Sequence, residues 1–257
     1  MPKLSSYLSL ITKSAATFHL GGKDATLTLL NKANINNKSL VLDIGCGAGH
    51  SSAMIAKHFG CQVIGVDLSQ DAIKNAQSIY GNSPLKNRIS FQEGDILSLP
   101  FKDNHFDFIL CESVLLFVHD KEKALLELKR VLKPSCFIGI NEIGLQGNKQ
   151  KLAKDFFAHE YFGITLENIN FYEKLYKKTG FSTILQVQNS MNAKKWIEMA
   201  LQQFLSPQGI FACLELGHMA LVNTSDKENF MDILKICLPN SKYFLQNLSL
   251  FLFLLQK

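Results

Sequence analysis

The sequence predicts an α/β protein built on a doubly wound, mostly parallel sheet. Strand and helix patterns alternate from residue 39 to about 142, and repeated β-α units of this length favour parallel strands joined by right-handed crossovers. A glycine-rich stretch, VLDIGCGAGH (41–50), follows the first apolar run, which is where such sheets bind their ligands. The 257 residues suffice for one large domain with a cap.

Each unit of this region carries its own signal. The run SLVLDIG (39–45) is continuously apolar, as expected of a strand covered on both faces. Helical spacing over 50–60 ends at Gly60, and Ser69 caps a second helix over 69–81. The other elements expected here are strands at 61–67, 88–95, 106–113 and 136–142 and a helix at 120–134 that ends before Pro134.

Composition narrows the class of partner. The net charge of +5 is mild and the lysines are spread out, whereas a nucleic-acid footprint is usually denser, so nucleic acid is not favoured as a partner. The six cysteines form no CxxC pair and no zinc pattern, which indicates reduced thiols, no metal site and a cytoplasmic protein. The N-terminus lacks the apolar core of a signal peptide, and the tail LSLFLFLLQK is only about half a membrane span, so it is interpreted as a buried strand.

Three glycines at every second position, Gly45, Gly47 and Gly49, indicate a backbone that something must approach closely. A dinucleotide fingerprint, GxGxxG, would need a third glycine where His50 stands. Asp43 would also place a negative charge beside a pyrophosphate. Both observations argue against a nicotinamide dehydrogenase.

An acid stands at the ends of three successive strands: Asp43, Asp67 and Asp95. S-adenosylmethionine, which carries an ammonium and a sulfonium, suits this pattern. Asp43 is placed to serve the ammonium, Asp67 to accept both ribose hydroxyls, and Asp95 to accept from the adenine amine beside an amide of Ile96. The competing interpretations are a helix N-terminal acid for Asp67 and a turn cap for Asp95.

The motifs VLDIGCGAGH, VIGVDLS, EGDILSLPF, FDFILCES and RVLKP occur in this order, and the chain resembles the type 11 group of class I S-adenosylmethionine-dependent methyltransferases. That group includes the ubiquinone and menaquinone C-methyltransferases. HLGGKDAT (19–26), ESVLLFV (112–118) and GINE (139–142) are similar to a subgroup whose members mostly lack an assigned substrate, with Leu20 in place of its usual proline. The resemblance implies a Rossmann-like, seven-stranded sheet whose last strand is antiparallel, and S-adenosylhomocysteine as product.

The resemblance also implies site residues. Those expected to contact the cofactor are Asp43, Gly45, Cys46, Gly47, Gly49, Asp67, Leu68, Asp95, Ile96 and Glu112. The candidates for catalytic help are Glu112, Glu142 and His19, because a general base is needed where the acceptor keeps its proton. The alternative interpretation of either glutamate is a structural hydrogen bond. The alternative interpretation of His19 is a solvent-facing position.

A single methyltransferase domain is expected over 1–257. It comprises N-terminal helices serving as a lid (1–38), a cofactor-binding core (39–142), and a helical cap with the last two strands (143–257). Within the last part, helices are expected over 149–179 and 191–240 and strands over 182–189 and 246–256.

The predicted reaction is methyl transfer to nitrogen, oxygen or carbon of a small molecule by in-line displacement. One alternative is a nucleic-acid methyltransferase, although CESV stands where base-amino methylation usually shows (D/N/S)PP(Y/F/W). A second is a protein that binds S-adenosylmethionine without catalysis. The sequence carries no signal on oligomeric state.

Overall fold

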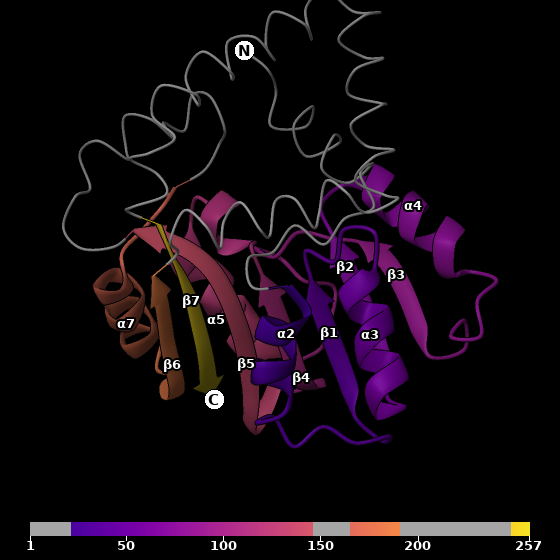
Figure 1. Cartoon of the computed structure of the whole chain (residues 1–257), viewed down its shortest axis with the longest axis horizontal. Helices are drawn as coiled ribbons and strands as arrows, with labels where there is room; N and C mark the ends of the chain where they lie inside the picture. The colour runs from indigo at the N-terminus through magenta and orange to yellow at the C-terminus, as the bar shows by residue number, and fades with distance from the viewer. Residues whose placement is uncertain (1–21, 146–164, 191–247) are drawn as a thin grey trace, which may run out of the picture.

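The computed structural model describes residues 22–145, 165–190 and 248–257, which form a seven-stranded sheet with helices on both faces (Figure 1). The strands are β1 (Leu40–Ile44), β2 (Gln62–Asp67), β3 (Ile89–Glu93), β4 (Phe106–Glu112), β5 (Leu132–Leu145), β6 (Ser182–Ser190) and β7 (Leu248–Gln256). The helices are α2 (Gly22–Leu30), α3 (His50–Phe59), α4 (Gln70–Tyr80), α5 (Lys121–Val131) and α7 (Ile169–Lys178), with a short 3₁₀ turn η1 (Leu115–Phe117).

The strand order is β3-β2-β1-β4-β5-β7-β6. Strands β1 to β5 pair in parallel, and β7 runs antiparallel to both β5 and β6. This confirms the expected doubly wound sheet with an antiparallel last strand. The order reverses between β1 and its neighbours β2 and β4, so the chain leaves these strands toward opposite faces and opens a ligand position at their carboxyl ends.

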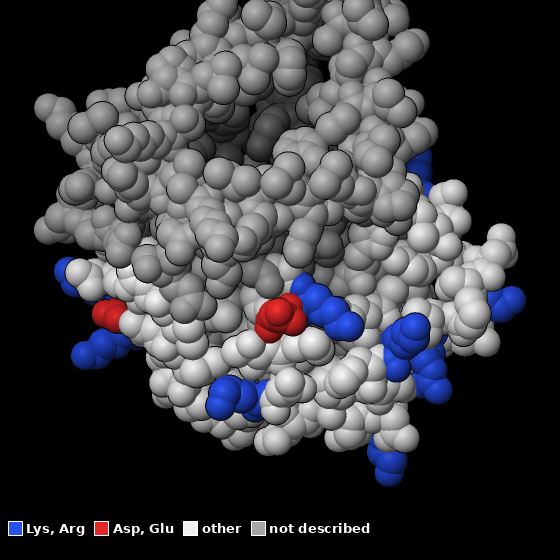
Figure 2. All heavy atoms as spheres, in the orientation of Figure 1, with Lys and Arg blue, Asp and Glu red and all other residues white. Residues whose placement is uncertain are grey.

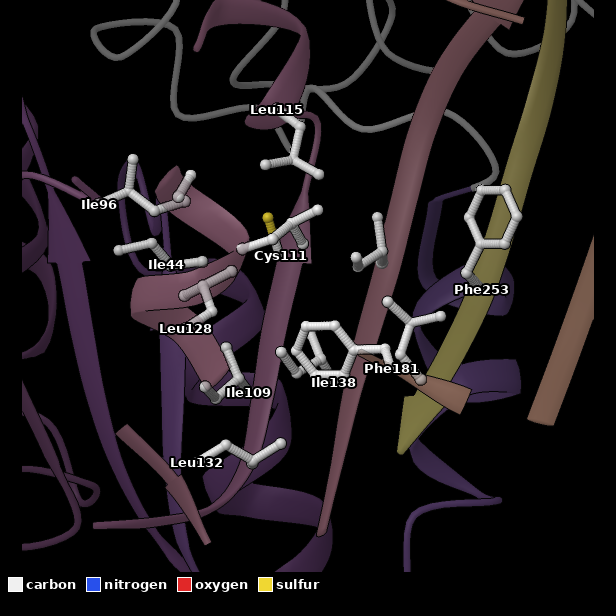
Figure 3. Close-up of a cluster of buried hydrophobic side chains, with 14 of the residues drawn as sticks. Ile44, Ile96, Ile109, Cys111, Leu115, Leu128, Leu132, Ile138, Phe181 and Phe253 are labelled. Carbon is white, nitrogen blue, oxygen red and sulfur yellow. The ribbon is translucent and has the colours of Figure 1, made fainter. Parts of the chain in front are cut away.

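Two hydrophobic cores lie on the two faces of the sheet. In Figure 1, α2 and α3 lie in front of the sheet and α5 lies behind it. The side chains of β4 alternate between the cores: Phe108 and Leu110 pack with the α2 and α3 side, whereas Ile109 and Cys111 pack with α5 and α7. Figure 3 shows this second core, in which Leu128 of α5 lies among residues of β1, β4 and β5.

The apolar tail is an inner strand of the sheet. Residues 250–255 of β7 are buried, and they pair with β5 on one side and β6 on the other. The prediction of a buried strand is therefore confirmed. No helix in the described ranges is long and apolar enough to cross a bilayer.

Several element boundaries differ from expectation: the helix predicted at 120–134 ends at Val131, and the strand predicted to end at 142 runs to Leu145. The strand predicted at 136–142 is longer and begins at Leu132, because Leu132 pairs with Phe106 before the register shifts by a bulge that contains Pro134. The helix predicted over 149–179 begins, within the described part, at Ile169, where the Asn168 side chain caps it. Residues 1–21, 146–164 and 191–247, where the lid and most of the cap were expected, lie outside the described residues.

Two leucines of α5 allow a matched test of the core. Leu128 is fully buried, whereas Leu126 is 48% exposed on the same helix. We expect Leu128→Ala to lower the free energy of unfolding by about 2–5 kcal/mol through lost burial and a cavity. Leu126→Ala should change it by less than about 0.5 kcal/mol. Urea denaturation measures both, and equal losses would contradict this packing.

Candidate cofactor site and active site

The loop after β1, residues 45–49, is called the glycine loop here. Gly45, Gly47 and Gly49 all adopt positive φ, at 69°, 51° and 81°. The amides of Gly45 and Cys46 both donate to the carbonyl of Val66, at 2.7 and 3.1 Å. The loop therefore turns back sharply onto β2 before α3 begins, and this reversal requires left-handed backbone that glycine adopts at least cost.

Gly45 and Gly47 are glycines for different reasons. A Cβ atom on Gly45 would overlap a methyl group of Val114, which packs directly on this backbone. A Cβ atom on Gly47 would meet nothing within 4 Å. The space in the Cβ direction of Gly47 is thus free of other described residues.

Asp67 ends β2 and holds the glycine loop. Its carboxylate accepts from the amide of Gly47 and from that of Ser69, each at 2.9 Å. A carboxylate has about four acceptor positions, so two amides leave capacity for two hydroxyl donors. Burial raises the pKa of Asp67. Leu68 follows it and is 62% exposed, an apolar side chain open to an aromatic ring.

Asp43 lies inside β1, beneath the glycine loop. It is buried and accepts a 2.6 Å hydrogen bond from the Ser52 hydroxyl of α3. Burial raises the pKa of Asp43 to about 7, and the neighbouring charges of Glu112 and Asp67 push it in the same direction. The site is thus electronegative, and a cation placed there would be stabilised.

Glu112 ends β4 and joins three elements. Its carboxylate accepts from Thr26 of α2 at 2.8 Å, from Ser51 of α3 at 3.2 Å and from Asn141 of β5 at 3.2 Å. The predicted structural hydrogen bond is therefore present. The charge nevertheless acts on Asp43, which places Glu112 at the same end of the sheet as the glycine loop.

Glu142 lies on the opposite face of β5 from Asn141, because side chains alternate along a strand. It is fully buried, and its Oε1 accepts from the amides of Val114 and Leu115 at 2.9 and 2.7 Å. Burial raises the pKa of Glu142 to about 8 despite these two hydrogen bonds. Glu112 and Glu142 were expected at one site, and the structure places them on different faces of the sheet.

The remaining predicted residues divide into three groups. Asp95 is exposed and accepts from the amide of Leu97 at 2.8 Å, as a turn cap does, and Ile96 beside it is buried. Cys46 is buried in the glycine loop, and burial raises the pKa of its thiol. His19 lies outside the described residues.

Sequence reasoning missed four residues that shape the site: Thr26, Ser51, Ser52 and Val114. Ser51 and Ser52 stand in the first turn of α3, directly after the glycines, where hydroxyls often serve helix starts. That position was a usable signal. Thr26 and Val114 lie in the quoted stretches HLGGKDAT and ESVLLFV, but only the fold shows that they reach Glu112 and Gly45.

The donor set fits S-adenosylmethionine. Acidic groups surround the glycine loop, and an exposed apolar residue follows the acid that ends β2. In the described ranges, no three histidine, cysteine, aspartate or glutamate side chains are grouped as a metal ion would need.

Comparison with known families agrees with this fit: residues 42–140 match the methyltransferase domain family. This match identifies a methyltransferase domain within the chain. The match covers the glycine loop, Asp67 and Glu112, and it ends one residue before Asn141.

Three similarities place this methyltransferase among known proteins. It is 28% identical over 218 residues to an uncharacterised protein of Haemophilus influenzae, covering 84% of each chain. It is 42% identical over 100 residues to norajmaline N-methyltransferase of Rauvolfia serpentina, covering 39% of this chain and 34% of the relative. Its fold matches phosphoethanolamine N-methyltransferase 2 of Haemonchus contortus, solved with S-adenosyl-L-methionine, with a TM-score of 0.72 at 21% identity, covering 100% of this chain and 58% of that one.

Two alanine substitutions separate packing from backbone in the glycine loop. We expect Gly45→Ala to lower the free energy of unfolding by about 2–4 kcal/mol, because a new methyl group collides with Val114 in addition to the strained φ. Gly47→Ala should cost only about 1 kcal/mol, the strain alone. Thermal and urea denaturation measure both, and a greater loss at Gly47 would contradict the geometry.

Buried acids make stability depend on pH. The folded-state pKa of Glu142, about 8, lies above its ordinary 4.5, so the fold favours the protonated form. The free energy of unfolding should therefore fall as pH rises between these values, by on the order of 1–3 kcal/mol. Glu142→Gln keeps an oxygen acceptor and cannot ionise, so it should flatten this dependence.

Urea denaturation across pH 4.5–8 tests this for Glu142→Gln against wild type. Glu93→Gln on β3, an exposed site, controls for the loss of one negative charge. A slope that is the same in wild type and Glu142→Gln would show that Glu142 does not titrate in this range.

Proposed function

We propose that this enzyme methylates a small molecule, holding S-adenosylmethionine on the glycine loop between Asp43, Asp67 and Glu112. One observation carries the proposal. The carboxylates of Glu112 and Asp67, which end the strands on either side of β1, act electrostatically on Asp43 beneath a loop in which the Cβ direction of Gly47 is open. A doubly charged cationic donor with two ribose hydroxyls matches that arrangement in charge and in hydrogen bonding.

Each part of the donor then has its own partners. The methionine half lies against the glycine loop, and its ammonium group lies toward Asp43, whose ionised form it favours. The ribose hydroxyls donate to the two remaining acceptor positions of Asp67. Adenine lies against Leu68 and reaches Asp95 and the amide of Ile96.

The methyl group moves by in-line displacement. The acceptor's electron pair forms a new bond to the methyl carbon while the carbon–sulfur bond breaks, and sulfur keeps that pair as S-adenosylhomocysteine. Because the donor is already activated, the protein contributes mainly orientation, for which effective molarities of roughly 10⁵–10⁸ M are known. The hydrogen bonds from Thr26, Ser51 and Asn141 fix the position of the Glu112 carboxylate and so contribute to this orientation.

An amine acceptor needs no general base, because its neutral lone pair attacks directly. An alcohol or carbon acid needs one. Of the two glutamate candidates, Glu112 acts on Asp43 beneath the glycine loop, whereas Glu142 holds the amides of Val114 and Leu115 on the other face of the sheet. The name of norajmaline N-methyltransferase, to which part of the chain is similar, supports amines as the first acceptors to try.

Charge and cysteine placement support a small acceptor and a cytoplasmic enzyme. On the face shown in Figure 2, the lysine and arginine side chains of the described part are scattered and form no continuous stripe, as a nucleic-acid track would require. Cys46, Cys61 and Cys111 are free and buried, which suits a reducing compartment.

Asp67 tests the cofactor site. We expect Asp67→Ala to weaken binding of S-adenosylmethionine and S-adenosylhomocysteine by at least about tenfold, because a charged acceptor and the anchor of the glycine loop are both removed. Isothermal titration calorimetry measures this, with NADH as a negative control ligand. At about 100 times the dissociation constant, the cofactor should stabilise wild type by roughly 2.7 kcal/mol.

A turnover assay separates the alternatives. The assay measures release of S-adenosylhomocysteine in the presence of each compound of a panel of methyl acceptors. The panel starts with amines and quinol precursors and includes short nucleic acids. Turnover with a small molecule supports the proposal, and turnover with nucleic acid alone overturns it. Tight binding with no turnover of any kind would indicate a protein that binds S-adenosylmethionine without catalysis.

A further inference from the structure

We propose that Glu142 is a positioning residue, which sets the turn after β4 and, through Val114, the shape of the glycine loop. It is then no general base. The inference rests on the proposed function in one respect: the glycine loop must hold the methionine half of the cofactor.

The first link is the capture of two consecutive amides by one carboxyl oxygen. Oε1 of Glu142 accepts from Val114 and Leu115 at 2.9 and 2.7 Å, and the side chain is fully buried. These amides belong to the turn that joins β4 to η1. Buried amides without a partner are costly, so this carboxyl group determines where the turn lies.

The second link is the strain of the turn itself. Ser113, directly before Val114, adopts a φ of 55°, which is uncommon for a residue other than glycine. Such backbone persists where its surroundings hold it. Here both holders come from adjacent residues of β5: the carbonyl of Asn141 accepts from the Ser113 amide at 2.7 Å, and Glu142 accepts from the next two amides.

The third link joins the turn to the cofactor loop. A methyl group of Val114 occupies the space that a Cβ atom on Gly45 would need. Gly45 in turn donates its amide to Val66, which starts the reversal of the glycine loop. A displacement of Val114 therefore changes the support beneath Gly45, although Glu142 lies on the opposite face of the sheet from Glu112.

The surroundings of Glu142 agree with a role that needs no ionisation. Its Oε2 is buried and has no hydrogen-bond partner among the described residues, and the same holds for the hydroxyls of Tyr172 and Tyr176. The charged and titratable groups that act on this region are Lys121 and Glu167, with the Cys111 thiol. A protonated carboxyl still accepts both amides through its carbonyl oxygen, but it cannot take a proton from an acceptor.

Two variants of Glu142 and two ligands test the proposal. Glu142→Met keeps the side-chain length and removes both hydrogen bonds, whereas Glu142→Gln keeps an oxygen acceptor and removes the charge. The ligands are S-adenosylhomocysteine and 5′-methylthioadenosine, which shares the adenosine part and lacks the amino-acid part. Calorimetry yields both dissociation constants for each protein.

We expect Glu142→Met to raise the dissociation constant of S-adenosylhomocysteine about tenfold and that of 5′-methylthioadenosine by less than about twofold. Glu142→Gln should bind both ligands as wild type does. A merely structural loss would weaken both ligands together. Equal losses for the two ligands, or a Glu142→Gln variant as weak as Glu142→Met, would overturn the proposal.

Val114→Ala keeps the two amide hydrogen bonds and removes the packing on Gly45. It is the variant to use in the same binding experiment if Glu142→Met does not fold. It should show the same loss confined to S-adenosylhomocysteine, and unchanged affinity for both ligands would overturn the third link. If wild type itself fails to bind S-adenosylhomocysteine, the proposed function fails and this inference with it. If wild type binds and the variants do not differ, the inference alone fails.

Discussion

The reversal of the chain after β1 is the constraint on which the rest of the site depends. The Val66 carbonyl accepts two consecutive amides and the Asp67 carboxylate accepts a third, so the glycine loop is bound back onto β2 at two points. Positive φ at three alternate residues makes that path possible. Because the loop is anchored, α3 starts where Ser51 and Ser52 reach Glu112 and Asp43.

Buried carboxyl groups serve two different purposes in this molecule. Asp43, Asp67 and Glu112 lie around the glycine loop and make that end of the sheet electronegative. Glu142, one position beyond Asn141 on β5, faces the other core and holds backbone amides. The alternation of side chains along a strand, and not distance in sequence, separates these roles.

Hydrophobic periodicity and helix-capping residues predicted most of the helices and strands. Continuous apolar runs predicted parallel strands. Gly60 indicated the end of α3 and Ser69 the start of α4, and the apolar tail was correctly interpreted as a buried strand. The start of β5 was predicted too late, because Pro134 ordinarily ends an element and nothing local indicates that Leu132 pairs with Phe106. The acids at strand ends were found because parallel strands bring their carboxyl ends to one edge.

The sequence by itself determined the fold class, the resemblance to methyltransferases and the positions of the glycines and acids, since these depend on local spacing and on the order of motifs along one chain. Only the tertiary structure decided which of those groups meet. It paired Thr26 with Glu112 across 86 positions of sequence, packed Val114 on Gly45, and placed Glu112 and Glu142 on opposite faces. The reason is physical: register and pleat set which side chains converge, and both follow from pairing between strands distant in sequence.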